Sequence, residues 1–117
     1  MPSSDPATRL QDILDHIQAA HSFVSDVTYE DFSKDPMRLF AAIRALEVIS
    51  EASRRLPNEM KHRHSQIDWA AVAAAGNIYR HEYDVVNPRR IWRTIQHDLD
   101  ELEQACSAEL KISRKRE

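Results

Sequence analysis

The chain of 117 residues carries 16 Lys and Arg against 19 Asp and Glu, and this formal charge of −3 excludes a general basic field for nucleic acid. The single Gly and five Pro are typical of a helical chain with almost no strand. We expect one domain over residues 1–117, frayed at 1–6 and 112–117. One cysteine excludes an internal disulfide. Without an apolar leader or a run of about 18 apolar residues, we expect a cytoplasmic protein without membrane contact.

Two long helices are expected in the first half of the chain. Ser4-Asp5-Pro6 offers a cap and a first turn for a helix that runs to about Asp26. Thr28 begins a short helical turn, and Asp35-Pro36 starts the second long helix, which Pro57 ends. Apolar residues at helical spacing predict the buried face of this second helix. They are Met37, Phe40, Ile43, Leu46, Ile49 and Leu56.

A polar stripe lies beside that apolar face rather than opposite it. Arg44, Glu47 and Glu51 stand at i, i+3 and i+7 on the second long helix. On the residues alone, the simplest interpretation is a surface ion pair that contributes a few tenths of a kcal/mol.

Residues 58–65 form a polar connection with at most one helical turn. His62 and His64 lie within it and raise the question of a metal site. An i, i+2 pair without a nearby Cys or a third His is a poor ligand set. We therefore expect solvated histidines and no metal.

Two more helices are expected in the second half. Asp68-Trp69 caps the third, whose residues 70–75 are small enough for another helix to approach closely. Asn87-Pro88 caps the last, and its apolar stripe predicts burial of Cys106 as an unreactive thiol. The basic tail over residues 111–116 is weak evidence for RNA contact, because short basic termini are common. The stripe consists of Ile91, Trp92, Ile95, Leu99, Leu102, Cys106 and Leu110.

The segment 76–84 places Asn, Arg, His and two Tyr beside the only glycine. Asn77 precedes Arg80 by three residues and His81 by four, and these spacings share a helix face. Tyr83 follows Arg80 by three. We expect these groups to converge on one small surface and name them as the candidate site. The alternative is that Arg80 and His81 only cap a helix C-terminus, where cations are favoured by about 0.3–1 kcal/mol.

An ordered set of short segments over about residues 8–106 resembles the HepT-like branch of the HEPN superfamily. The segments are Arg44–Ala52, Leu56-Pro57, His64–Trp69, Arg80–Val86, Ile91-Trp92 and Asp98-Leu99. The resemblance implies an all-α antiparallel bundle of four to five helices. It also implies a homodimer in which the polar motifs of two protomers face a shared cleft. The long apolar stripes and the low basic charge agree with such a dimer, and two dimers could associate further.

The same resemblance implies the toxin of a toxin–antitoxin pair. Its activity would be metal-independent endoribonuclease cleavage of RNA, with no cofactor. Its partner would be an antitoxin of the MntA-like minimal nucleotidyltransferase type.

The family pattern is an Arg, four to six residues, a His, one residue and a Tyr. His81 and Tyr83 match it, whereas Gly76 stands five residues before the His and an Arg appears instead at position 80. On a helix, Arg80 is displaced by about 100° from His81. A long flexible Arg side chain can still bend into the cleft.

The resemblance assigns a role to each residue of the candidate site. His81 acts as general base on a ribose 2′-hydroxyl, and Arg80 holds the scissile phosphate. Asn77 orients the His or donates to a phosphate oxygen, and Tyr83 positions the nucleotide. Tyr83 is also the implied target of adenylylation by the partner with ATP, which would place negative charge against Arg80 and His81 and close the cleft.

Two further expectations follow from the resemblance. The helix that carries Arg44 and Glu51 would border the cleft, so Glu51 would pair with Arg80 or Arg44 and fix its direction. The alternative function is a catalytically inactive helical dimer that only binds its nucleotidyltransferase partner, and Gly76 in place of the family Arg supports it.

Overall fold

The computed structural model describes residues 5–81 and 87–116, without the side chains of Arg80 and His81. Every regular element in these ranges is helical, so the prediction of an all-α fold is confirmed. The helices are α1 (Pro6–Val24), α2 (Tyr29–Ser33), α3 (Pro36–Arg54), α4 (Asn58–His62), α5 (Trp69–His81), α6 (Pro88–Arg93), the π-helical η3 (Thr94–Asp98) and α7 (Asp100–Lys115).

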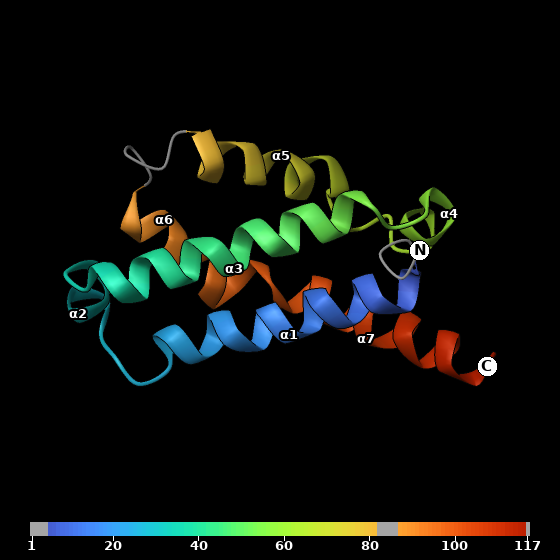
Figure 1. The fold of residues 1–117 in the computed structure, drawn as a ribbon, viewed down its shortest axis with the longest axis horizontal. Coiled ribbons are helices and arrows are strands. Elements are labelled where there is room, and N and C mark those ends of the chain that lie inside the picture. Colours follow the sequence, from blue (N-terminus) through green and yellow to red (C-terminus); the bar gives the residue numbers. More distant parts are fainter. Residues whose placement is uncertain (1–4, 82–86, 117) are drawn as a thin grey trace.

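The long helices form an elongated antiparallel bundle of 45 × 28 × 28 Å (Figure 1). Helix α3 lies at the centre, with α1 on one side and α5 on the other, and α7 packs against α1. Helices α3 and α5 run in opposite directions, and α5 ends at the same end of the molecule as α6 begins (Figure 1). No helix in the described ranges combines the length and apolarity needed to cross a membrane.

The helix starts lie where the sequence places them, because each expected cap forms. The side chains of Asp5, Thr28, Asp35, Asp68 and Asn87 each accept a hydrogen bond from a backbone N–H of the following turn. These bonds satisfy donors that a helix start otherwise leaves unpaired. The polar connection also contains a single short helix, α4, as expected.

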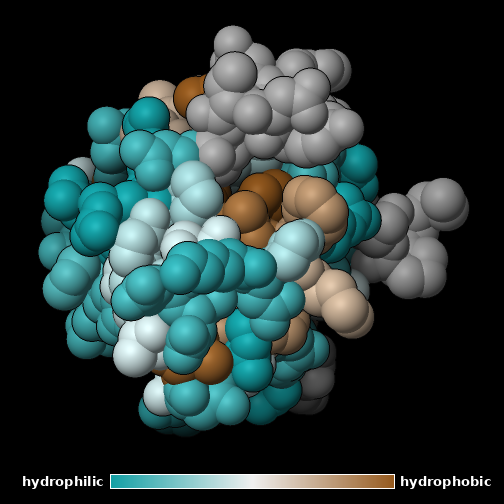
Figure 2. All heavy atoms as spheres, turned by 90° about the vertical axis from the view of Figure 1, so that its left-hand side faces the viewer, coloured by the Kyte–Doolittle hydropathy of each residue, from teal (hydrophilic) through white to brown (hydrophobic). Residues whose placement is uncertain are grey.

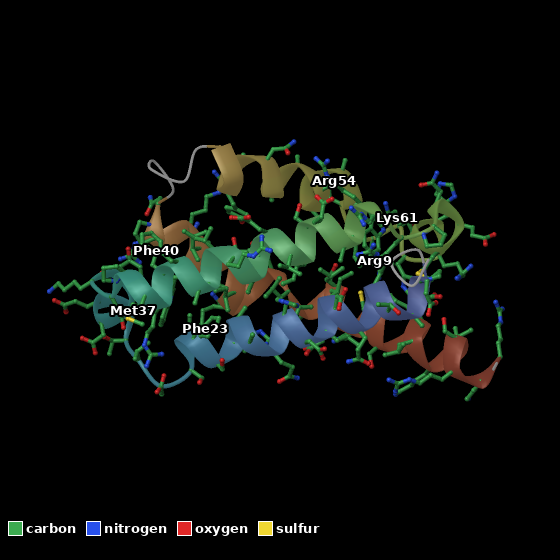
Figure 3. All side chains as sticks on the ribbon, in the orientation of Figure 1. Arg9, Phe23, Met37, Phe40, Arg54 and Lys61 are labelled. Atoms are coloured by element: carbon green, nitrogen blue, oxygen red, sulfur yellow. The ribbon has the colours of Figure 1, made fainter. Side chains whose placement is uncertain are left out.

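The predicted apolar face of α3 is wrong at its first two residues. Met37 and Phe40 are 83% and 57% exposed, whereas Ile43, Leu46 and Ile49 are buried. Each step of three residues falls about 60° short of a full turn, so a stripe built from such steps drifts around the helix. Alanines 42, 45 and 52 complete the buried face instead. Figure 3 labels Met37 and Phe40 at one end of the bundle, and Figure 2 shows that end with apolar atoms gathered in a mostly hydrophilic surface.

The last helix differs from its prediction in continuity. Its apolar stripe is buried as expected, with Trp92 only half-buried, but the π-helical η3 and a break at Leu99 divide it into α6 and α7. π-helical turns locally bend a helix, and apolar periodicity does not reveal them. Helix α7 continues to Lys115, beyond residue 112 where fraying was expected to begin.

Candidate active site

Helix α5 meets α3 through Ser50 and Gly76. The buried Ser50 hydroxyl donates to the Val72 carbonyl at 2.7 Å, with the Ala73 carbonyl at 3.0 Å, and accepts from the Gly76 N–H at 3.0 Å. A side chain of α3 therefore bonds directly to the backbone of α5. Gly76 is itself buried, and its missing Cβ suits this close contact. The close approach predicted from the small residues of α5 is confirmed.

Three further hydrogen bonds hold the first half of α5 in place. Arg54 Nε donates to the Ala73 carbonyl at 3.2 Å. Trp69 Nε1, at the start of the helix, donates to the carbonyls of Lys61 and His64 at 3.1 and 3.0 Å. The helix is thus attached at its start and in its middle, and these attachments position the turn that carries the candidate site.

The predicted site residues gather at the end of α5. Asn77 is exposed, four residues before His81 on the same helix. Arg80 and His81 are its last two residues, and their side chains lie outside the described part of the structure. Tyr83 lies outside the described residues altogether. The convergence of these side chains on one surface therefore stays a prediction.

Tyr79 lies between Asn77 and Arg80 of the candidate site, but it points inward. Its side chain is buried, and burial raises the pKa of its hydroxyl. The nearby charge of Arg90 and a hydrogen bond with Thr94 act on this pKa in the opposite direction. These contacts connect the last turns of α5 to α6 and η3.

The polar stripe of α3 contains the expected ion pair. Arg44 Nη1 lies 3.3 Å from Glu47 Oε2, and Glu51 Oε1 lies 3.5 Å from Arg55 Nη2. The pairing of Glu51 with Arg80 or Arg44 stays a prediction. A groove of about 370 Å³ lies along this stripe, between α3 and α1. Its lining consists of Arg9, Asp12, Arg44, Glu47, Val48, Glu51 and Ala52.

A larger groove of about 700 Å³, here called the α5–α6 groove, was not anticipated from the sequence. Its apolar lining comes from α3, α5 and α7, and Tyr79 lies in its wall. Three arginines of α6 also line it: Arg89, Arg90 and Arg93. The available sequence signal was three Arg within five residues directly after a helix cap.

The expectation of solvated histidines is wrong for His64. Its Nε2 lies 2.8 Å from the Oε2 of Glu109, a carboxylate only 5% exposed, and the His64 side chain is 18% exposed. Arg63 donates two hydrogen bonds to the same carboxylate, at 2.7 and 3.2 Å. The Arg63 bonds, with help from His64, hold the pKa of Glu109 below its ordinary value. His62 is exposed as expected.

The sequence contained a signal for Glu109 that was missed. This residue follows Cys106 by three residues and therefore falls on the buried face of the helix. A carboxylate in a core position requires partners. Among the described side chains, those of residues 5–79 and 87–116, no group of three or more His, Cys, Asp or Glu is placed to hold a metal ion. Cys106 is buried as predicted, and burial together with Glu109 raises the pKa of its thiol to about 12.

The fold and the position of the polar segment define a class of protein, an all-α antiparallel bundle in which the His of a His-x-Tyr sequence is the last residue of one helix. The sequence pattern of the family described as Ribonuclease HepT-like matches residues 13–109. The chain therefore belongs to this family, as the resemblance implied.

Individual relatives agree with the family match. A protein named "Probable ribonuclease HepT" from Thermococcus cleftensis is 38% identical over 93 residues, which cover 80% of this chain and 84% of the relative. A protein named "Putative RNase" from Caldanaerobacter subterraneus subsp. tengcongensis is 39% identical over 98 residues, covering 84% and 88%. Another of that name from Methanocaldococcus jannaschii is 32% identical over 108 residues, covering 89% of each chain. No solved structure matches the chain significantly.

Proposed function

We propose that the protein is the toxin of a toxin–antitoxin pair and cleaves RNA as a metal-independent endoribonuclease. The observation that carries this proposal is the family match over residues 13–109, which includes His81 and Tyr83. The names of the relatives as ribonucleases support it. The location of Arg80 and His81 on the last turn of the firmly attached α5 agrees with a positioned site.

In this proposal, His81 takes the proton from a ribose 2′-hydroxyl, and the 2′-oxygen attacks the adjacent phosphorus. The bond to the 5′-oxygen breaks, and this oxygen takes up the proton that the His81 imidazolium returns. The products are a 2′,3′-cyclic phosphate on one fragment and a 5′-hydroxyl on the other. Arg80 binds the phosphate and stabilises the negative charge that grows on it. Asn77 orients His81 or donates to a phosphate oxygen.

The register of α5 against α3 supports a role for the polar stripe. Position 80 lies one turn, or about 6 Å, beyond Gly76. Because the two helices are antiparallel, this turn lies toward Glu47 and Arg44 rather than further toward Arg54. This register supports Arg44 as a residue that directs Arg80, and the supporting role of Glu51 rests on the family resemblance alone.

The direct test is cleavage of RNA by the purified protein in EDTA. We expect loss of cleavage in His81→Ala and Arg80→Ala, while His62→Ala and Arg116→Ala serve as matched controls at exposed positions. A substrate with 2′-deoxyribose at the cleavage site should resist. Cleavage that persists in His81→Ala, or that acts on the deoxy substrate, would contradict the mechanism.

We further propose that a MntA-like minimal nucleotidyltransferase neutralises the toxin by adenylylating Tyr83. The Tyr83 oxygen would attack the α-phosphorus of ATP, and pyrophosphate would leave. The attached phosphate would then compete for Arg80 and His81. The test is intact-protein mass after incubation with the partner and ATP, where one adenylyl group should appear in wild type. If the Tyr83→Phe variant were labelled to the same extent, Tyr83 would not be the adenylylated residue.

A second candidate function is a catalytically inactive dimer that only binds the nucleotidyltransferase. The burial of Gly76 against Ser50 favours it, because the family Arg has no room at this position. Absence of cleavage by unmodified wild-type protein, together with retained binding of the partner, would select this alternative. Light scattering of the isolated protein tests the proposed homodimer and any larger assembly.

A further inference from the structure

Two arginines of the α5–α6 groove form no ion pair within the part of the chain that the structure describes. Arg90 and Arg93 are exposed on α6 and line the groove. Among the described residues, no carboxylate lies within ion-pair distance of either guanidinium. Arg89 differs, because it stacks over the Tyr29 ring at 4.1 Å and thereby joins α6 to α2.

The groove is large enough for part of a nucleic acid strand. Its volume of about 700 Å³ falls within the range of about 300–1,000 Å³ that is usual for small-molecule sites. Its floor is apolar, built from Ile49, Val72 and Leu102, and the Tyr79 ring forms part of one wall. An unstacked base gains from contact with such apolar and aromatic side chains.

The groove is also lined by three carboxylates. They are Asp98 and Glu101, where η3 is followed by α7, and Asp68, whose carboxylate caps α5. Asp98 follows Arg93 by five residues and Arg90 by eight, about 7.5 and 12 Å along a helix, and it forms no ion pair with either arginine in the described residues. Both guanidinium groups therefore keep their hydrogen-bond donors available to phosphate oxygens.

The arginine end is also the end nearest the candidate active site. Arg90 lies close enough to Tyr79 for its charge to act on the tyrosine hydroxyl, and Tyr79 precedes His81 by two residues on α5. Helix α6 begins at the end of the molecule where α5 stops (Figure 1). A phosphate held there would belong to the same strand as a phosphate held at the end of α5.

We propose that Arg90 and Arg93 bind backbone phosphates of single-stranded RNA next to the scissile bond, with one base lying on the apolar floor of the groove. The guanidinium fork suits phosphate oxygens in two-bond geometry. This inference rests on the proposed ribonuclease function, because it assigns the strand that the active site would cleave.

The test measures binding separately from cleavage. A fluorescent single-stranded RNA of about 12 nucleotides, within the range of single-strand sites, is titrated by anisotropy at several salt concentrations. All proteins carry His81→Ala, so that the RNA stays intact. Arg90→Gln/Arg93→Gln is compared with Arg114→Gln/Arg116→Gln, which removes the same charge from the exposed end of α7.

Loss of two phosphate contacts should lower the slope of log K against log salt by about 1.4 and weaken binding by about tenfold or more. The α7 control should keep the slope of the parent. An unchanged slope in Arg90→Gln/Arg93→Gln would overturn the inference. A change of its mass in light scattering would also overturn it, because the arginines would then hold a second copy of the chain.

The experiments distinguish a failure of the phosphate-site proposal from a failure of the ribonuclease proposal. RNA binding with the expected slope, but no cleavage by the protein with His81, would remove the ribonuclease proposal and leave the phosphate site. Cleavage at the wild-type rate by Arg90→Gln/Arg93→Gln would remove the phosphate site and leave the ribonuclease.

Discussion

Replacing Gly76 by Ala tests how closely α5 is held against α3. On an exposed helix face this change stabilises a protein by about 1 kcal/mol. At position 76 the backbone is buried, and its N–H lies 3.0 Å from the Ser50 hydroxyl, so a new methyl group has to displace α3. Such overpacking costs about 1–3 kcal/mol. Subtracting the gain in helix propensity from the cost of overpacking predicts a net destabilisation of about 0–2 kcal/mol. This is opposite in sign to the effect of helix propensity alone.

Urea unfolding measures this free energy, and an unchanged m value is required for the comparison. Ala74→Gly on the exposed face of the same helix is the control for propensity and should cost about 1 kcal/mol. Ser50→Ala removes the hydroxyl and should cost about 1 kcal/mol, and the pair of changes should not be additive because both act on one contact. Stabilisation of about 1 kcal/mol by Gly76→Ala would refute the close-contact reasoning.

Three further predictions concern the rest of the bundle. The pKa of Glu109 in the folded protein lies below its ordinary value of 4.5, so the stability that this carboxylate contributes is complete above pH 4.5 and is lost as the pH falls through the folded pKa. Glu109→Gln should therefore flatten this part of the stability–pH curve, as measured by urea unfolding. With its pKa raised to about 12, the Cys106 thiol should resist thiol reagents at pH 8 until the protein unfolds, and rapid labelling of the native protein would contradict its burial. In thermal melts, Met37→Ser should alter stability by less than about 0.5 kcal/mol, whereas Ile43→Ser should cost several times more. Equal losses in the two variants would mean that Met37 is buried, as the sequence predicted.

Local rules predicted most of the fold from the sequence. Caps such as Asp35 and Asn87 are decided by a few neighbouring residues, so the starts of α3 and α6 were predicted correctly. The buried stripe of α7 was also correct, because its residues follow steps of three and four that stay on one face. The face of α3 failed where steps of three accumulated, at Met37 and Phe40.

Contacts between distant segments were not predictable in the same way. His64 reaches Glu109 across 45 residues of sequence, and Ser50 reaches Gly76 across 26. A helical period places each residue on a face but does not say which helix lies opposite. The α5–α6 groove depends on α3, α5, α6 and α7 together, so the cluster of arginines in the sequence did not by itself reveal that Arg90 and Arg93 line a groove.

The contact of Ser50 with Gly76 bears on the displaced arginine of the family motif. A side chain at position 76 has no room, because the α3 hydroxyl already bonds to the backbone there. One turn further along α5, the helix backbone lies about 6 Å beyond the level of Ser50. It lies there toward Glu47, a carboxylate that pairs with Arg44. The backbone at position 80 therefore lies toward this partly open polar stripe, whereas position 76 lies at a closed contact. If RNA cleavage depends on Arg80, the close packing of α3 and α5 explains why the motif carries its arginine at position 80 rather than at position 76.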